Sequence, residues 1–117
     1  MRVHLTGKWQ PTDVDNMLNE IRKLDQVQEA HTGEEAAKLF EMPAEREGEI
    51  LVIAKDDAVI GSSAARHDLS QLGGHPLRSH GGLSERETLL LRSTAAQGAA
   101  MDRVWHNFDV FELALNY

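Results

Sequence analysis

The chain has 117 residues, of which 41% are hydrophobic and 26% are charged, and this length and composition predict one folded domain and exclude a disordered tail. No apolar run approaches the roughly 20 residues that span a bilayer, and a net charge of -7 opposes binding to nucleic acid or to an anionic membrane surface. Cysteine is absent, which excludes disulfides and thiolate chemistry, and no basic and apolar leader follows Met1, so a soluble, cytoplasmic protein is expected.

Two elements are expected in the first 24 residues. Polar and apolar residues alternate over residues 2–6, as in a half-buried strand, and Gly7 ends that strand. From Thr12 onward, apolar residues recur at spacings of three and four, which predicts an amphipathic helix. These apolar residues are Val14, Met17, Leu18, Ile21 and Leu24.

A second strand and a second helix are expected next. Residues 26–30 are a candidate short strand. Thr32 and Glu35 have the spacing of a capping box, in which the hydroxyl and the carboxylate each accept a hydrogen bond from the other residue's backbone N–H. The helix that begins there should run to about Glu41, because Pro43 cannot continue it.

The most apolar segment of the chain is residues 50–54, Ile-Leu-Val-Ile-Ala. A continuous apolar run of this length indicates a strand that is covered on both faces, so it should be the central strand of the sheet. Asp56 and Asp57 have the composition of a tight turn, and with residues 58–60 they predict a hairpin.

The last 57 residues are less regular. Residues 61–83 contain five glycines and three histidines and predict a long loop, the kind of segment in which function is often found. Residues 88–91 fit either a strand or part of a helix capped by Ser84. A helical stripe is expected over residues 101–115. The whole pattern predicts an α+β fold: a small single domain with a short mixed or antiparallel sheet and about three helices, expected to dimerise.

The long loop contains candidate metal ligands. His80 precedes Gly81 and Gly82, which allow the backbone to approach a ligand closely. His67 and His75 are further donors in the same loop, and Zn²⁺ accepts imidazole nitrogen, although the spacing matches no closed zinc module. The alternative is that these histidines are solvated or hydrogen-bonded to backbone.

Three segments together resemble the C-terminal portion of phosphonoacetate hydrolase, a family of the alkaline phosphatase superfamily. They are residues 61–70 (GSSAARHDLS), 76–85 (PLRSHGGLSE) and 107–116 (NFDVFELALN). Residues 36–53 are similar to the stretch just before that region. The resemblance implies one domain over 1–117, in which about 1–48 correspond to the end of the family's cap region and about 49–117 to its C-terminal segment.

The resemblance also implies a chemistry. The family hydrolyses the carbon–phosphorus bond of phosphonoacetate to acetate and phosphate with two zinc ions and a threonine nucleophile, and His80 matches a zinc ligand. The nucleophile and the other zinc ligands lie before the region that this chain resembles. One imidazole cannot hold two metal ions, so we expect the chain to be inactive alone. Arg78 is a candidate contact for a phosphonate or carboxylate, with a structural ion pair as its alternative.

Three functional hypotheses remain open from the sequence. The first is a free-standing fragment of the hydrolase, truncated and without activity. The second is a subunit that completes an active enzyme with a separately encoded N-terminal chain. The third is a small dimeric module that binds zinc or an anion through His67, His75 and His80. A homodimer is expected because the last helix offers an aromatic surface of Trp105, Phe108 and Phe111.

Overall fold

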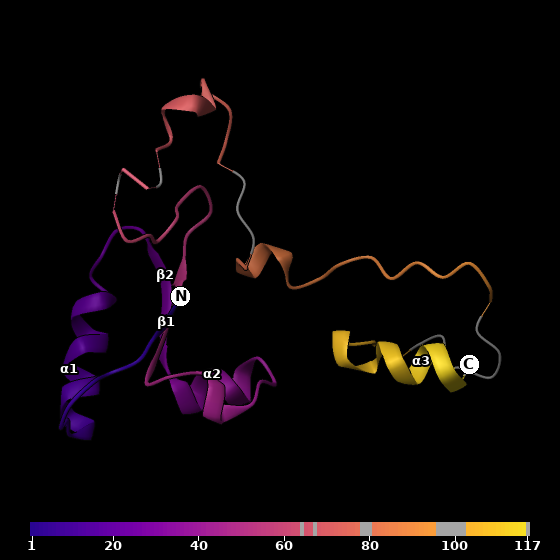
Figure 1. Cartoon of the computed structure of the whole chain (residues 1–117), viewed down its shortest axis with the longest axis horizontal. Helices are drawn as coiled ribbons and strands as arrows, with labels where there is room; N and C mark the ends of the chain where they lie inside the picture. Colours follow the sequence, from indigo (N-terminus) through magenta and orange to yellow (C-terminus); the bar gives the residue numbers. More distant parts are fainter. Residues whose placement is uncertain (64, 67, 78–80, 96–102, 117) are drawn as a thin grey trace. The chain divides into compact units, whose positions relative to one another are not determined.

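The computed structural model describes residues 1–63, 65–66, 68–77, 81–95 and 103–116 (Figure 1). The chain forms two compact units, Met1–Glu87 and Thr88–Tyr117, and each is described by itself. The described residues contain three α-helices and a three-stranded antiparallel sheet, so the predicted α+β class is confirmed. None of the helices in these ranges is long and apolar enough to cross a membrane.

The sheet of the first unit has the strand order β1-β3-β2, and both pairs are antiparallel. The strands are β1 (Arg2–Val3), β2 (Val27–Thr32) and β3 (Ile50–Ala54). The central place of β3 is therefore confirmed. β1 is shorter than the sequence predicts, because the Leu5 N–H donates to the Glu49 carboxylate at 2.7 Å instead of continuing the ladder.

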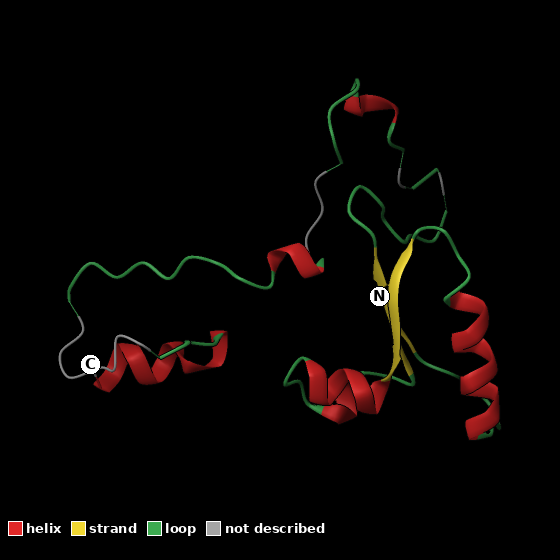
Figure 2. Cartoon of the chain, turned by 180° about the vertical axis from the view of Figure 1, so that it is seen from behind, coloured by secondary structure: helices red, strands yellow, loops and turns green. Residues whose placement is uncertain are grey.

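The two helices of this unit cover opposite faces of the sheet (Figures 1 and 2). Helix α1 (Pro11–Ile21) packs Val14 and Leu18 against the β3 residues Ile50 and Val52. Helix α2 (Gly33–Leu39) packs Ala36 against the alternate β3 residues, Leu51 and Ile53. Because successive strand side chains point to opposite faces, the unbroken apolar run of β3 fills both layers.

Local signals fix where these helices begin. The capping box is confirmed at α2, where the Glu35 N–H donates to the Thr32 hydroxyl at 3.2 Å and the Thr32 N–H donates to the Glu35 carboxylate at 3.0 Å. The hydrogen bond from the Thr32 N–H lowers the pKa of Glu35.

Helix α1 ends at Ile21, so the predicted extension to Leu24 is wrong. The Arg22 guanidinium donates to the Ala30 carbonyl at 2.7 Å, which accompanies the turn of the chain toward β2.

Two other predicted elements are not formed. A turn exists at Asp56 and Asp57, but residues 58–60 form no strand, so the predicted hairpin is wrong. The reason is that both edges of β3 are already paired, one with β1 and the other with β2. Residues 88–91 form neither a strand nor a helix.

The second unit contains helix α3 (Val110–Asn116), preceded by the 3₁₀ turn η4 (Asn107–Asp109). The predicted C-terminal helix is therefore shorter than its apolar stripe, and residues 101–102 of that stripe lie outside the described residues. The buried Asp109 carboxylate accepts from the His106 N–H at 2.9 Å and pairs with the Arg103 guanidinium at 3.0 Å. The same guanidinium lies over the Trp105 ring, 4.3 Å from its centroid.

The Asp109 carboxylate caps the turn that leads into α3, and we expect acid to weaken this cap by protonating the carboxylate. The hydrogen bond from the His106 N–H, with smaller help from Arg103, lowers the pKa of Asp109. A depressed pKa in the folded state contributes stability above the ordinary value of about 3.9 and loses it as pH falls through the folded value. The amide shift of His106, followed by NMR from pH 6 to pH 2, should therefore titrate below pH 4.

The Asp109→Asn variant is the matched control, because an amide oxygen can still accept the hydrogen bond but does not titrate. Its His106 amide shift should stay flat across the acid range. A wild-type midpoint at or above the ordinary aspartate value would contradict the expected cap.

Candidate functional site

Most of the side chains singled out from the sequence lie outside the described residues. These are His67, Arg78 and His80, so their roles stay predictions. His75 is described and exposed, and its backbone N–H donates to the Leu72 carbonyl at 2.9 Å. Among the described residues there is no group of three or more His, Cys, Asp or Glu side chains that could hold a metal ion.

Asp68 forms a local turn. Its carboxylate accepts from the Ser70 N–H and from the Ser70 hydroxyl, both at 2.9 Å. These hydrogen bonds favour the ionised form and lower the pKa of Asp68. Its carboxylate therefore holds the loop together, as expected of an Asx turn.

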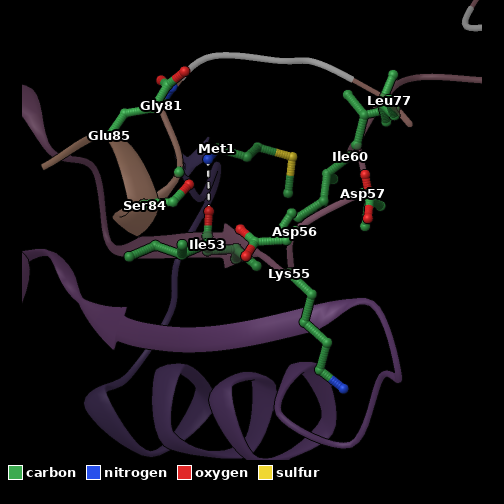
Figure 3. Close-up of a pocket in the computed structure, with 15 residues that line it drawn as sticks. Met1, Ile53, Lys55, Asp56, Asp57, Ile60, Leu77, Gly81, Ser84 and Glu85 are labelled. Atoms are coloured by element: carbon green, nitrogen blue, oxygen red, sulfur yellow. Dashed lines mark hydrogen bonds between the residues drawn. The ribbon is translucent and has the colours of Figure 1, made fainter. Parts of the chain in front are cut away.

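A cavity of about 510 Å³ lies in the first unit, at the carboxyl end of β3. One side is formed by β3 and the residues that follow it to Ile60, with Leu77 next to Ile60, and the other side by Gly81, Gly82, Ser84 and Glu85 (Figure 3). Leu77 and Gly81 directly flank the segment 78–80 that holds Arg78 and His80. Two residues that line the cavity therefore directly flank the segment with the predicted zinc ligand, and this makes the cavity the candidate site.

The glycine segment contacts the sheet through one apolar side chain and is closed by one internal hydrogen bond. Leu83 packs against the cluster of Ala36, Leu51 and Ile53 on the α2 face of the sheet. The Glu85 carboxylate accepts from the Gly81 N–H at 2.7 Å (Figure 3). Gly81 has φ +85°, in the left-handed region where glycine has no steric penalty. The Leu83 contact is therefore the one of these that joins the segment to the sheet, and the Gly81–Glu85 hydrogen bond shapes the segment itself.

The opposite side of the cavity is a turn. The Ala58 N–H donates to the Lys55 carbonyl at 3.1 Å, and Asp57 has φ 62°, a conformation that aspartate tolerates better than most residues. The amino group of Met1 donates to the Val52 carbonyl at 2.6 Å (Figure 3). Burial, with a smaller contribution from Arg2, lowers the pKa of that amino group.

The charges of the lining do not suit an anion. Asp56, Asp57 and Glu85 provide three carboxylates. Of the two cations in the lining, the Met1 amino group is engaged by the Val52 carbonyl, and Lys55 extends away from the other lining residues (Figure 3). A phosphonate placed here would meet repulsion from these carboxylates unless other groups supplied positive charge. The described lining alone is thus neither a phosphonate site nor a zinc site.

Sequence reasoning missed the residues that form the cavity. The sequence predicts only a tight turn at Asp56 and Asp57 and assigns no role to Glu85. A usable signal was the apolar Leu83 directly after two glycines, since an apolar residue in a polar loop indicates an anchoring contact. The sequence pattern alone does not show that Leu83 packs against β3.

Comparison with known proteins agrees with the resemblance seen in the sequence. No family model matches the chain. Two crystal structures of phosphonoacetate hydrolase from Sinorhizobium meliloti 1021, one with phosphonoformate and one with phosphonoacetate, are each 32% identical with a TM-score of 0.54. Each match covers 69% of this chain and 19% of the solved chain.

A curated relative gives the same result over a short stretch. Phosphonoacetate hydrolase of Penicillium oxalicum is 70% identical over 30 residues, which is 26% of this chain and 42% of the relative. The class of protein that the chain resembles is therefore a hydrolase. The particular enzyme that the chain resembles is phosphonoacetate hydrolase, and this resemblance is confirmed over a portion of that enzyme.

Proposed function

We propose that this chain is a portion of a phosphonoacetate hydrolase and does not cleave phosphonoacetate by itself. The single observation that supports this proposal is coverage: the match includes 69% of this chain but only 19% of the solved enzyme. A bimetallic hydrolase takes its ligands and its nucleophile from several segments. A chain that corresponds to about a fifth of the enzyme would therefore contain only part of that machinery.

His80 is the residue that we propose to serve the reaction. It occupies the position of a zinc ligand in the segment that resembles the family, and it lies between Leu77 and Gly81 of the cavity in sequence but outside the described residues. Zinc, when bound, would supply Lewis-acid stabilisation and an activated nucleophile. The described residues alone do not complete a zinc site, so the other ligands would come from the remainder of the enzyme. Arg78 is proposed as a contact for the substrate anion.

The test is phosphate release from phosphonoacetate in the presence of zinc. The purified chain alone should release no phosphate above a protein-free blank. Mixing it with a Sinorhizobium meliloti enzyme that lacks the matching segment should restore release, because the mixture then contains all of the ligands. Turnover by the chain alone, purified without a histidine tag and free of contaminating hydrolase, would contradict the proposal.

A pair of histidine variants tests the assigned ligand in the same mixture. His80→Ala should reduce phosphate release by at least about a hundredfold, because removal of a direct zinc ligand costs at least as much as the 10- to 100-fold seen for outer-shell partners. His75→Ala is the matched control, since this exposed imidazole lies in the same loop and is not assigned by the resemblance. Wild-type activity of the His80→Ala variant would remove His80 from the site.

A further inference from the structure

The loop that follows His80 in sequence is closed by hydrogen bonds of its own. The Glu85 carboxylate accepts from the Gly81 N–H at 2.7 Å, and the Glu85 N–H donates to the Gly82 carbonyl at 3.2 Å. The end of the loop is a 3₁₀ turn, η3 (Leu83–Glu85). The side chain and the backbone of Glu85 therefore both bind back to the two glycines.

The conformation of Gly81 explains why this loop needs a restraint. Its φ is +85°, in the left-handed region that residues with a Cβ rarely adopt. A Cβ built on Gly81 would meet no described atom within 4 Å, so no described residue packs against that side of the glycine. The restraint that the structure shows on the Gly81 backbone is the hydrogen bond to Glu85.

This restraint acts on the peptide group that joins Gly81 to the predicted zinc ligand. His80 lies outside the described residues, but its carbonyl carbon is bonded to the Gly81 nitrogen, and a peptide group is planar. A hydrogen bond to the Gly81 N–H thus limits how the peptide group after His80 can turn. Leu83 packs on Leu51 and Ile53, so the same loop is attached to the sheet.

We infer that Glu85 is a positioning residue of the proposed hydrolase site and acts by holding the Gly81 peptide group beside His80. The inference rests on the proposed function. The negative charge of Glu85 would repel a phosphonate, so its contribution would come through the backbone and not through contact with the substrate. Groups that orient a metal ligand typically change metal affinity or activity by about 10- to 100-fold.

Three variants separate this role from an effect of charge. Glu85→Ala removes the hydrogen-bond acceptor, whereas Glu85→Gln keeps an acceptor oxygen at the end of a side chain of the same length and removes only the charge. Glu87→Ala is the matched control, because it removes the same charge from an exposed side chain two residues further along the chain. Each variant is measured as the isolated chain and in a mixture with the truncated Sinorhizobium meliloti enzyme.

The readout in the isolated chain is hydrogen exchange of the Gly81 amide, measured by NMR without zinc. We expect Glu85→Ala to accelerate this exchange by about tenfold, because a hydrogen bond of ordinary strength is worth about that factor. Glu85→Gln and Glu87→Ala should exchange at nearly the wild-type rate, since both keep an acceptor for the Gly81 N–H.

The readout in the mixture is phosphate release from phosphonoacetate with zinc. Glu85→Ala should lower kcat by about tenfold or more and leave KM nearly unchanged, because the loop would orient the zinc ligand and not the substrate. Glu85→Gln should restore most of the lost rate, and Glu87→Ala should match the wild type.

Two results would overturn the inference directly. One is a wild-type rate of Gly81 exchange or of phosphate release in Glu85→Ala. The other is a loss of activity in Glu85→Gln as large as in Glu85→Ala, which would make the charge essential, as in a direct metal ligand. A wild-type mixture that releases no phosphate would contradict the proposed function, and the exchange rates would still decide whether Glu85 holds Gly81.

Discussion

Replacing Gly33 with alanine should strongly destabilise the first unit. Gly33 is the first residue of α2, and its N–H donates to the Glu49 carbonyl at 2.9 Å. A Cβ built on Gly33 would overlap the carbonyl oxygen of Gly48, which is backbone and cannot rotate away. Gly48 cannot retreat easily, because it has φ +71° and lies against the Val3 carbonyl. The start of α2 and the residues that lead into β3 would have to separate, and we expect a cost of about 3 kcal/mol or more.

Urea unfolding followed by circular dichroism measures this cost. The matched control is Gly82→Ala, because its Cβ would meet only the Ser84 hydroxyl oxygen at 3.6 Å, an ordinary contact, and its φ is -84°. The control should change the free energy of unfolding by less than about 0.5 kcal/mol. If Gly33→Ala lowered the free energy of unfolding no more than the control does, the backbones of Gly33 and Gly48 could not lie as close as the structure places them.

The parts of the fold that could be predicted are those set by neighbours in sequence. The capping box of Thr32 and Glu35 is local, and its two hydrogen bonds formed as expected. The burial of β3 on both faces followed from five consecutive apolar residues. In each case the physical cause lies within a few residues of its effect.

The predictions that failed depend on partners distant in the chain. Residues 58–60 have the composition of a strand, but β1 and β2 already occupy both edges of β3. Leu24 continues the apolar spacing of α1, yet the helix ends at Ile21, and Leu24 is 55% exposed. Neither the occupied edges of β3 nor the early end of α1 can be inferred from the local sequence pattern.

The candidate site divides in the same way. Gly81 has a positive φ, a conformation that glycine adopts without strain, while the approach of a ligand to the Gly81 and Gly82 backbone stays a prediction. Asp56, Asp57 and Glu85 line one cavity although they are far apart in sequence, and the packing of Leu83 on the sheet contributes to this arrangement. His80 is predicted as a zinc ligand only from the resemblance to a family, because its spacing to His67 and His75 matches no closed zinc module.

Replacing Arg2 with methionine should be the most damaging change of an exposed side chain. Glu47 is fully buried, and its Oε2 accepts from the Arg2 Nε at 3.0 Å. Within the described residues its other oxygen, Oε1, has no hydrogen-bond partner. The pairing with Glu47 raises the pKa of Arg2, so the guanidinium stays charged at any practical pH. Loss of this cation leaves a buried carboxylate without its counter-charge, and such losses typically cost about 3 to 5 kcal/mol.

The lower end of that range is the better expectation, because the Arg2 side chain is itself 49% exposed and water screens part of the pair. Combining Arg2→Met with Glu47→Leu should recover much of the loss, since two apolar side chains leave no charge to solvate. The four free energies of unfolding form a double-mutant cycle, and we expect a coupling of at least about 1 kcal/mol. Additive effects would mean that Arg2 contributes nothing to the burial of Glu47. The residues just before Gly48 and β3 would then not depend on this ion pair for their position.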